Sequence, residues 1–175
     1  MNGQKLEALR DRIFAALGRG AAREARRGIE KLRRYEPAEA ASLLTALCIE
    51  ERDAKGALKA WQECRARAPH EPYTLFLRAR IHLLMRERRA ALRALAPLFD
   101  APMSAEVAEK VYNLAGQCAR FLGAADKAVA FYARARDVAP SLALRALNAS
   151  NVLFNRHYLP AAPAEDRQAA EEYGS

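Results

Sequence analysis

The sequence predicts an all-α solenoid of about four helix–turn–helix hairpins followed by a C-terminal capping helix. A small residue recurs at intervals of 32, 34 and 37 positions, at Ala25, Ala57, Ala91 and Ala128. A bulky residue follows four positions later each time: Ile29, Trp61, Leu95 and Tyr132. Helix-ending prolines close three of the units, at Pro37, Pro69 and Pro140. Because small residues let helices approach closely and bulky ones fill the remaining space, this repeat predicts stacked helix pairs.

The fullest copy of the repeat runs from Glu109 to Pro140. It contains small and aromatic residues at fixed spacing on two predicted helices: Tyr112, Ala115, Gly116, Ala119, Ala128 and Tyr132. This spacing resembles the tetratricopeptide repeat (TPR) family. The resemblance implies a right-handed superhelical solenoid in which the first helix of each pair lines a concave, ligand-binding surface.

The first unit is expected from Lys5 to Pro37. Its first helix is amphipathic, with apolar residues at helical spacing: Leu6, Leu9, Ile13 and Leu17. Gly18 and Gly20 should end it, and a return helix is expected over Ala21–Arg34. Ile13 occupies a position where the repeat pattern has a small residue. Terminal repeats often depart from the pattern in this way, because they cap the stack.

The second unit is expected over Ala38–Pro69, with Asp53 as the N-cap of its second helix. Trp61 occupies the aromatic position between the helices, so a core role is favoured over a ligand anchor. The third unit begins at Pro72, and its first helix is apolar on more than one face: Tyr73, Leu75, Phe76, Leu77, Ala79, Ile81, Leu83 and Leu84. This excess suggests that part of the helix meets a ligand or another chain. Three extra residues before the fourth unit, near Pro102, belong in a turn.

The fourth unit should begin its first helix at Ser104 and Glu106, which suit a helix N-terminus. A fifth first helix follows Pro140, and a break is expected at His157-Tyr158-Leu159-Pro160. A polar helix is then expected over Ala164–Tyr173. The predicted organisation is a solenoid over residues 1–159 and a linker with a short polar helix over residues 160–175.

The C-terminal part carries a narrower resemblance. Its residues are Ser150-Asn151-Val152-Leu153-Phe154, His157-Tyr158-Leu159-Pro160, Pro163-Ala164-Glu165 and Tyr173-Gly174. This run is similar to the junction between repeats and catalytic domain in bacterial SPINDLY-like proteins, relatives of O-linked N-acetylglucosamine transferases. The resemblance implies a repeat region without catalysis, because the sugar-nucleotide domain would follow Ser175. A capping helix with asparagines that arise by chance is the alternative.

The formal net charge of +8 falls entirely within residues 1–102, because residues 103–175 carry eight basic and eight acidic side chains. Two dense basic stretches cause this, Arg19–Arg34 and Arg86–Arg93. Aromatic residues do not interleave with these arginines and no nucleic-acid module is recognisable, so a solvated helix face is favoured. The alternative function is a basic scaffold that binds nucleic acid or an acidic partner through the Arg19–Arg34 face. The arginine and alanine content is typical of a GC-rich bacterial genome.

No constellation for catalysis is recognisable. The serines lack a nucleophile motif, no phosphate-binding glycine loop occurs, and the three histidines are scattered. Cys48, Cys64 and Cys118 lack metal-ligand spacing and are expected to be buried and reduced. The sequence therefore predicts a non-enzyme with no cofactor and no metal. No apolar run is long enough to span a membrane and no signal peptide is recognisable, so a cytoplasmic location is expected.

Protein binding is the remaining function. Counting from the repeat starts, the groove-facing side chains should be Tyr73, Phe76, Arg80, Lys110, Asn113, Gln117, Arg120 and Asn151, with Arg10 and Phe14 in the first unit and Ser42 and Ile49 in the second. Polar groups beside aromatic rings suit an extended peptide or a partner helix. The expected partner is a protein or peptide rather than nucleic acid or a membrane, and the oligomeric state stays open.

Overall fold

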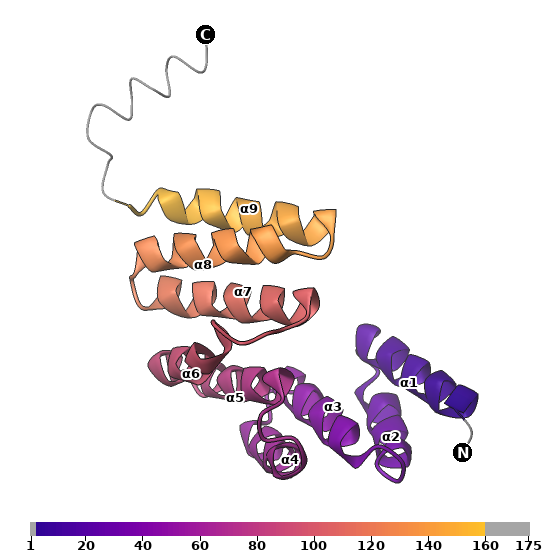
Figure 1. The fold of residues 1–175 in the computed structure, drawn as a ribbon. Helices are drawn as coiled ribbons and strands as arrows, with labels where there is room; N and C mark the ends of the chain where they lie inside the picture. The colour runs from indigo at the N-terminus through magenta and orange to yellow at the C-terminus, as the bar shows by residue number, and fades with distance from the viewer. Residues whose placement is uncertain (1–2, 160–175) are drawn as a thin grey trace, which may run out of the picture. The chain divides into compact units, whose positions relative to one another are not determined.

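The computed structural model describes residues 3–159, all of whose regular elements are helices (Figure 1). The chain divides into two compact units, residues 1–103 and 104–175. The first unit contains α1 (Gly3–Gly18), α2 (Ala22–Leu32), α3 (Pro37–Glu50), α4 (Ala54–Arg67), α5 (Pro72–Leu84), α6 (Arg88–Leu95) and a 3-10 turn, η1 (Ala96–Leu98). The second contains α7 (Ala105–Phe121), α8 (Ala125–Val138) and α9 (Leu142–Arg156).

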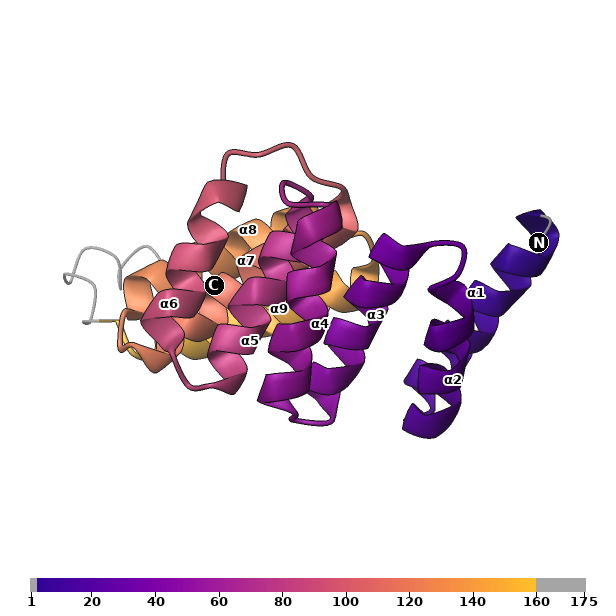
Figure 2. The ribbon, with the colours of Figure 1, turned by 90° about the horizontal axis from the view of Figure 1, so that it is seen from below.

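Consecutive helices pack in pairs, which confirms the predicted hairpins. Figure 2 shows α3 beside α4 in the first unit and Figure 1 shows α7, α8 and α9 side by side in the second. The recurring small residues are all fully buried: Ala25, Ala57, Ala91 and Ala128. Their bulky partners are buried as well: Ile29, Trp61, Leu95 and Tyr132. The repeat in the sequence is therefore the repeat of contacts between paired helices.

In the first and fourth hairpins, the two paired helices approach so closely that one of them has a glycine at the contact. A Cβ at Gly116 of α7 would lie 2.8 to 2.9 Å from three ring carbons of Tyr132 on α8. A Cβ at Gly28 of α2 would lie 2.6 Å from Cγ1 of Ile13 on α1. Ile13 is thus a fully buried knob whose small partner lies on the return helix, which explains why it occupies a position predicted to be small.

The turns inside the hairpins share one conformation. Among residues 3–159, a positive φ angle occurs at four positions: Gly20 (69°), Arg52 (59°), Arg86 (64°) and Gly123 (76°). Each lies five residues before the buried alanine of its unit. A left-handed residue after the first helix lets its last carbonyls be satisfied while the chain reverses direction. All four hairpins use this turn, although only the first and fourth have glycine there.

The predicted helix ends are confirmed with two differences. Oδ1 of Asp53 accepts from the Gly56 N–H (2.9 Å), and the Ser104 hydroxyl accepts from the Val107 N–H (3.4 Å), so both are N-caps. However, α2 ends at Leu32 rather than Arg34. Pro37 was expected to close the first hairpin, but it is the first residue of α3. Its missing N–H costs nothing there, because the first N–H of a helix has no intrahelical acceptor.

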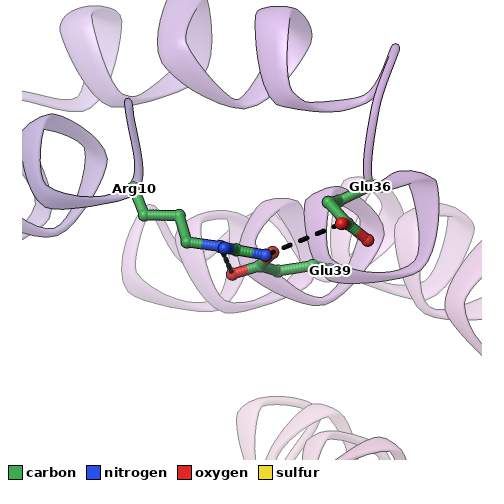
Figure 3. Close-up of polar contacts among 3 residues, drawn as sticks. All are labelled: Arg10, Glu36 and Glu39. Carbon is green, nitrogen blue, oxygen red and sulfur yellow. Dashed lines mark hydrogen bonds and ion pairs between the residues drawn. The ribbon is translucent and has the colours of Figure 1, made fainter. Parts of the chain in front are cut away.

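Ion pairs tie the first hairpin to the second within the first unit. Nε of Arg10 on α1 donates to both carboxylate oxygens of Glu39 on α3 (3.0 and 2.9 Å), and Glu36 lies 3.8 Å from its terminal nitrogen (Figure 3). The hydrogen bond to Glu39 raises the pKa of Arg10. Arg26 on α2 pairs with Glu51. Arg10 was expected to face a ligand, and in the structure its guanidinium is held by carboxylates of the same chain.

Trp61 is a core residue, as predicted. Its Nε1 donates to the carbonyl of Thr74 (2.8 Å), so α4 is joined to α5 by a buried hydrogen bond. Beside it, the sulfur of Cys64 lies 3.0 Å from the Ser42 hydroxyl and 3.2 Å from the Thr74 hydroxyl. Cys48, Cys64 and Cys118 are all buried, as expected, and none of the three forms a disulfide in the described part of the chain. Small polar residues therefore satisfy one another between α3, α4 and α5.

The first helix of the third hairpin, α5, is less exposed than its composition suggested. On α5, Phe76, Leu77, Ala79 and Ile81 are buried and the other apolar residues are half-buried. The extra residues lie in η1 and the loop after it, as expected.

α9 ends at Arg156, which confirms the break before His157. The helix predicted over residues 164–173 lies outside the described residues.

Candidate functional site

A row of polar side chains runs along one face of α7 in the second unit. Glu109, Asn113, Gln117 and Arg120 are spaced by four, four and three residues, which places them above one another on a helix. The opposite side of α7 carries the buried core residues Val111, Ala115 and Cys118. The amphipathic pattern of α7 therefore fixes which way this polar row points.

The row on α7 continues onto α9 through a chain of hydrogen bonds. Nε2 of Gln117 donates to Oδ1 of Asn113 (2.9 Å), and Nδ2 of Asn113 donates to Oδ1 of Asn148 on α9 (2.6 Å). Nδ2 of Asn148 then donates to Oε1 of Glu109 (2.8 Å). Every amide in the chain donates in the same direction, toward the carboxylate, which is the strongest acceptor. The side chains are thus held in one orientation before any ligand arrives.

Asn148 and Glu109 are the two buried residues of this series of hydrogen bonds, with exposed fractions of 0% and 5%. Because a buried polar group without a partner costs about 1 to 3 kcal/mol, their mutual bond also keeps α7 and α9 in register. Gln117, Asn113 and Asn151 are half-buried, so parts of their amides face solvent. The Asn151 carbonyl accepts from Nδ2 of Asn155 (2.8 Å), which adds a further amide to the same helix.

An aromatic cleft of about 470 Å³ adjoins the end of the polar row. It is lined by Arg120, Phe121, Gly123, Ala125, Phe154, Asn155 and Tyr158. The rings of Phe154 and Tyr158 are 5.4 Å apart, and the Arg120 guanidinium lies 4.7 Å from the ring centre of Phe121. The three aromatic side chains are about half exposed or more. Large apolar groups left in solvent around a concavity are typical of a binding site.

The predicted residues of the second unit come together only in part. Asn113 and Gln117 are hydrogen-bonded to each other, and Arg120 is in the same row and lines the cleft. Asn151 lies on α9, and Lys110 is exposed on α7, beside the row rather than in it. Their role in binding stays a prediction.

Three of the predicted residues in the first compact unit, Tyr73, Phe76 and Arg80, lie together on α5. The rings of Tyr73 and Phe76 stack at 5.7 Å, but Phe76 is only 6% exposed, which leaves little of its ring for a ligand. Burial raises the pKa of Tyr73, and the neighbouring Arg80 acts against that shift. Arg80 is paired with Glu50 on α3, so its charge is already partly neutralised. This group offers less accessible surface than the second unit does.

The site residues that were not predicted include Glu109, Phe154, Asn155 and Tyr158. The helical spacing that selected Asn113 also reaches Glu109, so that residue could have been found from the sequence. Asn148 is one of three asparagines, with Asn113 and Asn151, that the sequence offered for the groove. Phe154 and Tyr158 were taken as parts of a junction motif, and nothing in their spacing says that they border a cleft with Phe121.

The described residues hold no group of three or more histidine, cysteine or carboxylate side chains that could bind a metal ion. Across residues 3–159, no helix combines the length and the apolar character needed to cross a membrane. The residues that form the site are amides, one buried carboxylate, aromatic rings and an arginine.

No family model and no curated protein matches the sequence. Solved structures do match. PilF of Pseudomonas aeruginosa is 16% identical, with a TM-score of 0.70 over 89% of this chain and 73% of that chain. MamA from Desulfovibrio magneticus RS-1 is 17% identical, with a TM-score of 0.57 over 89% of this chain and 92% of that one. At these identities the likeness is one of fold, and the fold is a TPR-like array of helix hairpins.

Proposed function

We propose that the protein is a non-catalytic interaction module that binds a peptide segment along α7 and α9. The observation that carries this proposal is the ordered chain of amides from Gln117 to Glu109. Amide side chains offer both donors and acceptors, which is what the backbone of an extended peptide requires. Because these amides are already oriented, little side-chain entropy is lost when a peptide binds.

The adjoining cleft supplies what the amides lack, a pocket for an apolar side chain. Phe121, Phe154 and Tyr158 can surround an aliphatic or aromatic anchor, and Arg120 adds a positive charge at the rim. Aromatic and arginine side chains around a pocket are typical of the residues that dominate binding energy at protein interfaces. The preferred peptide would therefore have an apolar anchor next to a carboxylate.

Selection of displayed random peptides on the full chain tests this function. Peptides that bind should share an apolar anchor, and the double variant Gln117→Ala/Arg120→Ala should weaken them at least tenfold. The matched control is Gln62→Ala/Arg65→Ala on α4, which removes the same side-chain types from the first unit. If the selected peptides bound both variants equally well, or if no peptide were selected, the proposal would be wrong.

A finer proposal is that these repeats belong to a SPINDLY-like glycosyltransferase. It is supported by the run Ser150–Phe154, which lies on α9 and contributes Phe154 to the lining of the cleft. The test is to read the gene beyond the codon for Ser175. A sugar-nucleotide-binding domain in the same frame would support the proposal, and a stop codon or an unrelated domain would contradict it.

A further inference from the structure

A second concave surface lies in the first hairpin, in the other unit of the chain. This cleft of about 460 Å³ is lined by Lys5, Ala8, Leu9 and Arg12 of α1, and by Lys31, Arg34 and Tyr35 at the end of α2 and in the turn after it. Four of its seven lining residues are cationic and none is acidic. Like charges gathered around a concavity repel one another and create a strong positive potential inside it.

The positions of the charges on the two helices explain the convergence. Lys5 and Arg12 are seven residues apart on α1 with Leu9 between them, so all three lie on one face. The acidic residues of α1, Glu7 and Asp11, fall on a different face. α1 therefore places Lys5 and Arg12 on the cleft side, whereas its two carboxylates, and Arg10, which pairs with Glu39, lie elsewhere on the helix.

Several arginines near the cleft pair with carboxylates of the same unit. Arg19 pairs with Glu24 (3.2 Å), and Arg33 lies 3.5 Å from Glu63 of α4. Arg26 is paired with Glu51. The basic stretch Arg19–Arg34 is thus not one uniform face. Within this stretch, Lys31 and Arg34 are the two cations that line the cleft together with Lys5 and Arg12 of α1.

The cleft also has apolar and aromatic lining residues. Ala8 and Leu9 line it, and Tyr35 lines it with 48% of its surface exposed. The sequence places no aromatic residue among the arginines of α2, but Tyr35 directly follows Arg34 in the turn after the helix. Apolar and cationic side chains around one concavity suit a ligand with an apolar group flanked by anions.

We propose that this cleft binds an acidic peptide segment, with an apolar side chain on Leu9 and Tyr35 and carboxylates on the four cations. A peptide fits better than single-stranded nucleic acid, because strand binding relies on several aromatic platforms in succession and the cleft has one ring. The volume, near the lower end of the range for ligand pockets, holds one or two side chains. This surface shares no residue with the amide row of α7 and α9, so the two proposals stand or fall separately.

Fluorescence anisotropy with the full chain tests the cleft. The probe is a labelled peptide of four Glu-Glu-Leu repeats, and its control is the same peptide with glutamine for glutamate. The glutamate peptide should bind at least tenfold more tightly, and its affinity should fall steeply between low and physiological salt. Arg12→Glu/Lys31→Glu should weaken it at least tenfold, and Tyr35→Ala should weaken it severalfold.

The matched control is Lys55→Glu/Lys59→Glu, which changes the net charge by the same amount at exposed positions of α4. It should change the affinity less than threefold. Lys31→Gln/Arg34→Gln, which adds no carboxylate, serves as a second test variant, and circular dichroism checks that each variant is folded. The proposal is overturned if the control weakens binding as much as the cleft variants do, or if the glutamate peptide does not bind at low salt. It is also overturned if a twelve-nucleotide oligo-dT binds more tightly than the peptide with the same sensitivity to the variants.

Discussion

The first and fourth hairpins solve the same packing problem with the large and small residues exchanged. In the fourth hairpin the ring of Tyr132 on the second helix fits over Gly116 on the first. In the first hairpin Ile13 on the first helix fits over Gly28 on the second. Both hairpins also bury an alanine at the recurring position, Ala25 or Ala128. What is kept between them is the close approach of two helices, and the helix that carries the large residue is free to change.

Removing the large residue should have the greatest effect of any change to this contact. Tyr132→Ala should lower the free energy of unfolding by about 4 kcal/mol and Ile13→Ala by about 3 kcal/mol, because each leaves a cavity between paired helices. Urea unfolding followed by circular dichroism measures both. Tyr158→Ala, an exposed aromatic residue, is the matched control and should cost less than about 0.5 kcal/mol. Equal losses for Tyr132 and Tyr158 would show that the ring of Tyr132 is not a packing element.

Filling the small side of each contact should cost less. Gly116→Ala should destabilise the protein by about 2 kcal/mol, because overpacking against a buried ring outweighs the helix propensity gained by alanine. Gly28→Ala should cost about 1 kcal/mol, since only one atom of Ile13 would be closer than 3.0 Å to the new Cβ.

A double-mutant cycle identifies the partner in each hairpin. In a Tyr132→Ala background, Gly116→Ala should be neutral or stabilising, and in an Ile13→Ala background Gly28→Ala should be so as well. If Gly116→Ala cost the same with and without the tyrosine ring, the proposed exchange of large and small residues would be wrong.

The same exchange shows what the sequence could and could not predict. The spacing of Ala25, Ala57, Ala91 and Ala128 was sufficient for four hairpins, because each stacked hairpin buries the same position and that position therefore recurs with the length of the repeat. The contact of Ile13 with Gly28 was missed, because a compensating glycine on the partner helix has no fixed distance along the chain. The amides on α7 followed from helical spacing, whereas the clefts depend on which side chains of different helices meet.

The turns provide a third comparison, with a smaller expected effect. Arg52 and Arg86 adopt the left-handed conformation that Gly20 and Gly123 adopt in the first and fourth hairpins. That conformation costs a residue with a Cβ roughly 1 kcal/mol. Arg52→Gly and Arg86→Gly should therefore each stabilise the chain by up to about 1 kcal/mol.

Gly20→Ala and Gly123→Ala are the reciprocal changes and should each destabilise by about 1 kcal/mol. Neither new Cβ would meet an atom within 4 Å, so the cost would come from the backbone conformation alone. Thermal unfolding midpoints of the four variants measure the effect. An unchanged or lower midpoint for both arginine variants would contradict the account of the turns.

The last difference between the two hairpins is silent at neutral pH. Burial raises the pKa of Tyr132 above its ordinary value of 10.0, although Arg120 acts against the shift, whereas Ile13 has no group to titrate. Above pH 10 the unfolded chain loses the tyrosine proton more readily than the folded chain does, so stability falls as the pH rises through the folded pKa. Below pH 10 both states keep the proton and the contribution does not change.

Tyr132→Phe removes this dependence without removing the ring. Relative to wild type, the variant should gain stability between pH 9 and pH 11, as measured by urea unfolding at each pH. Below pH 9 the difference in stability between the variant and the wild type should stay constant, which serves as the internal control. A Tyr132→Phe curve that also paralleled the wild type between pH 9 and pH 11 would contradict this prediction. It would mean that the hydroxyl of Tyr132 ionises as readily in the folded chain as in water. The ring could not then be the buried element that the comparison with Ile13 requires.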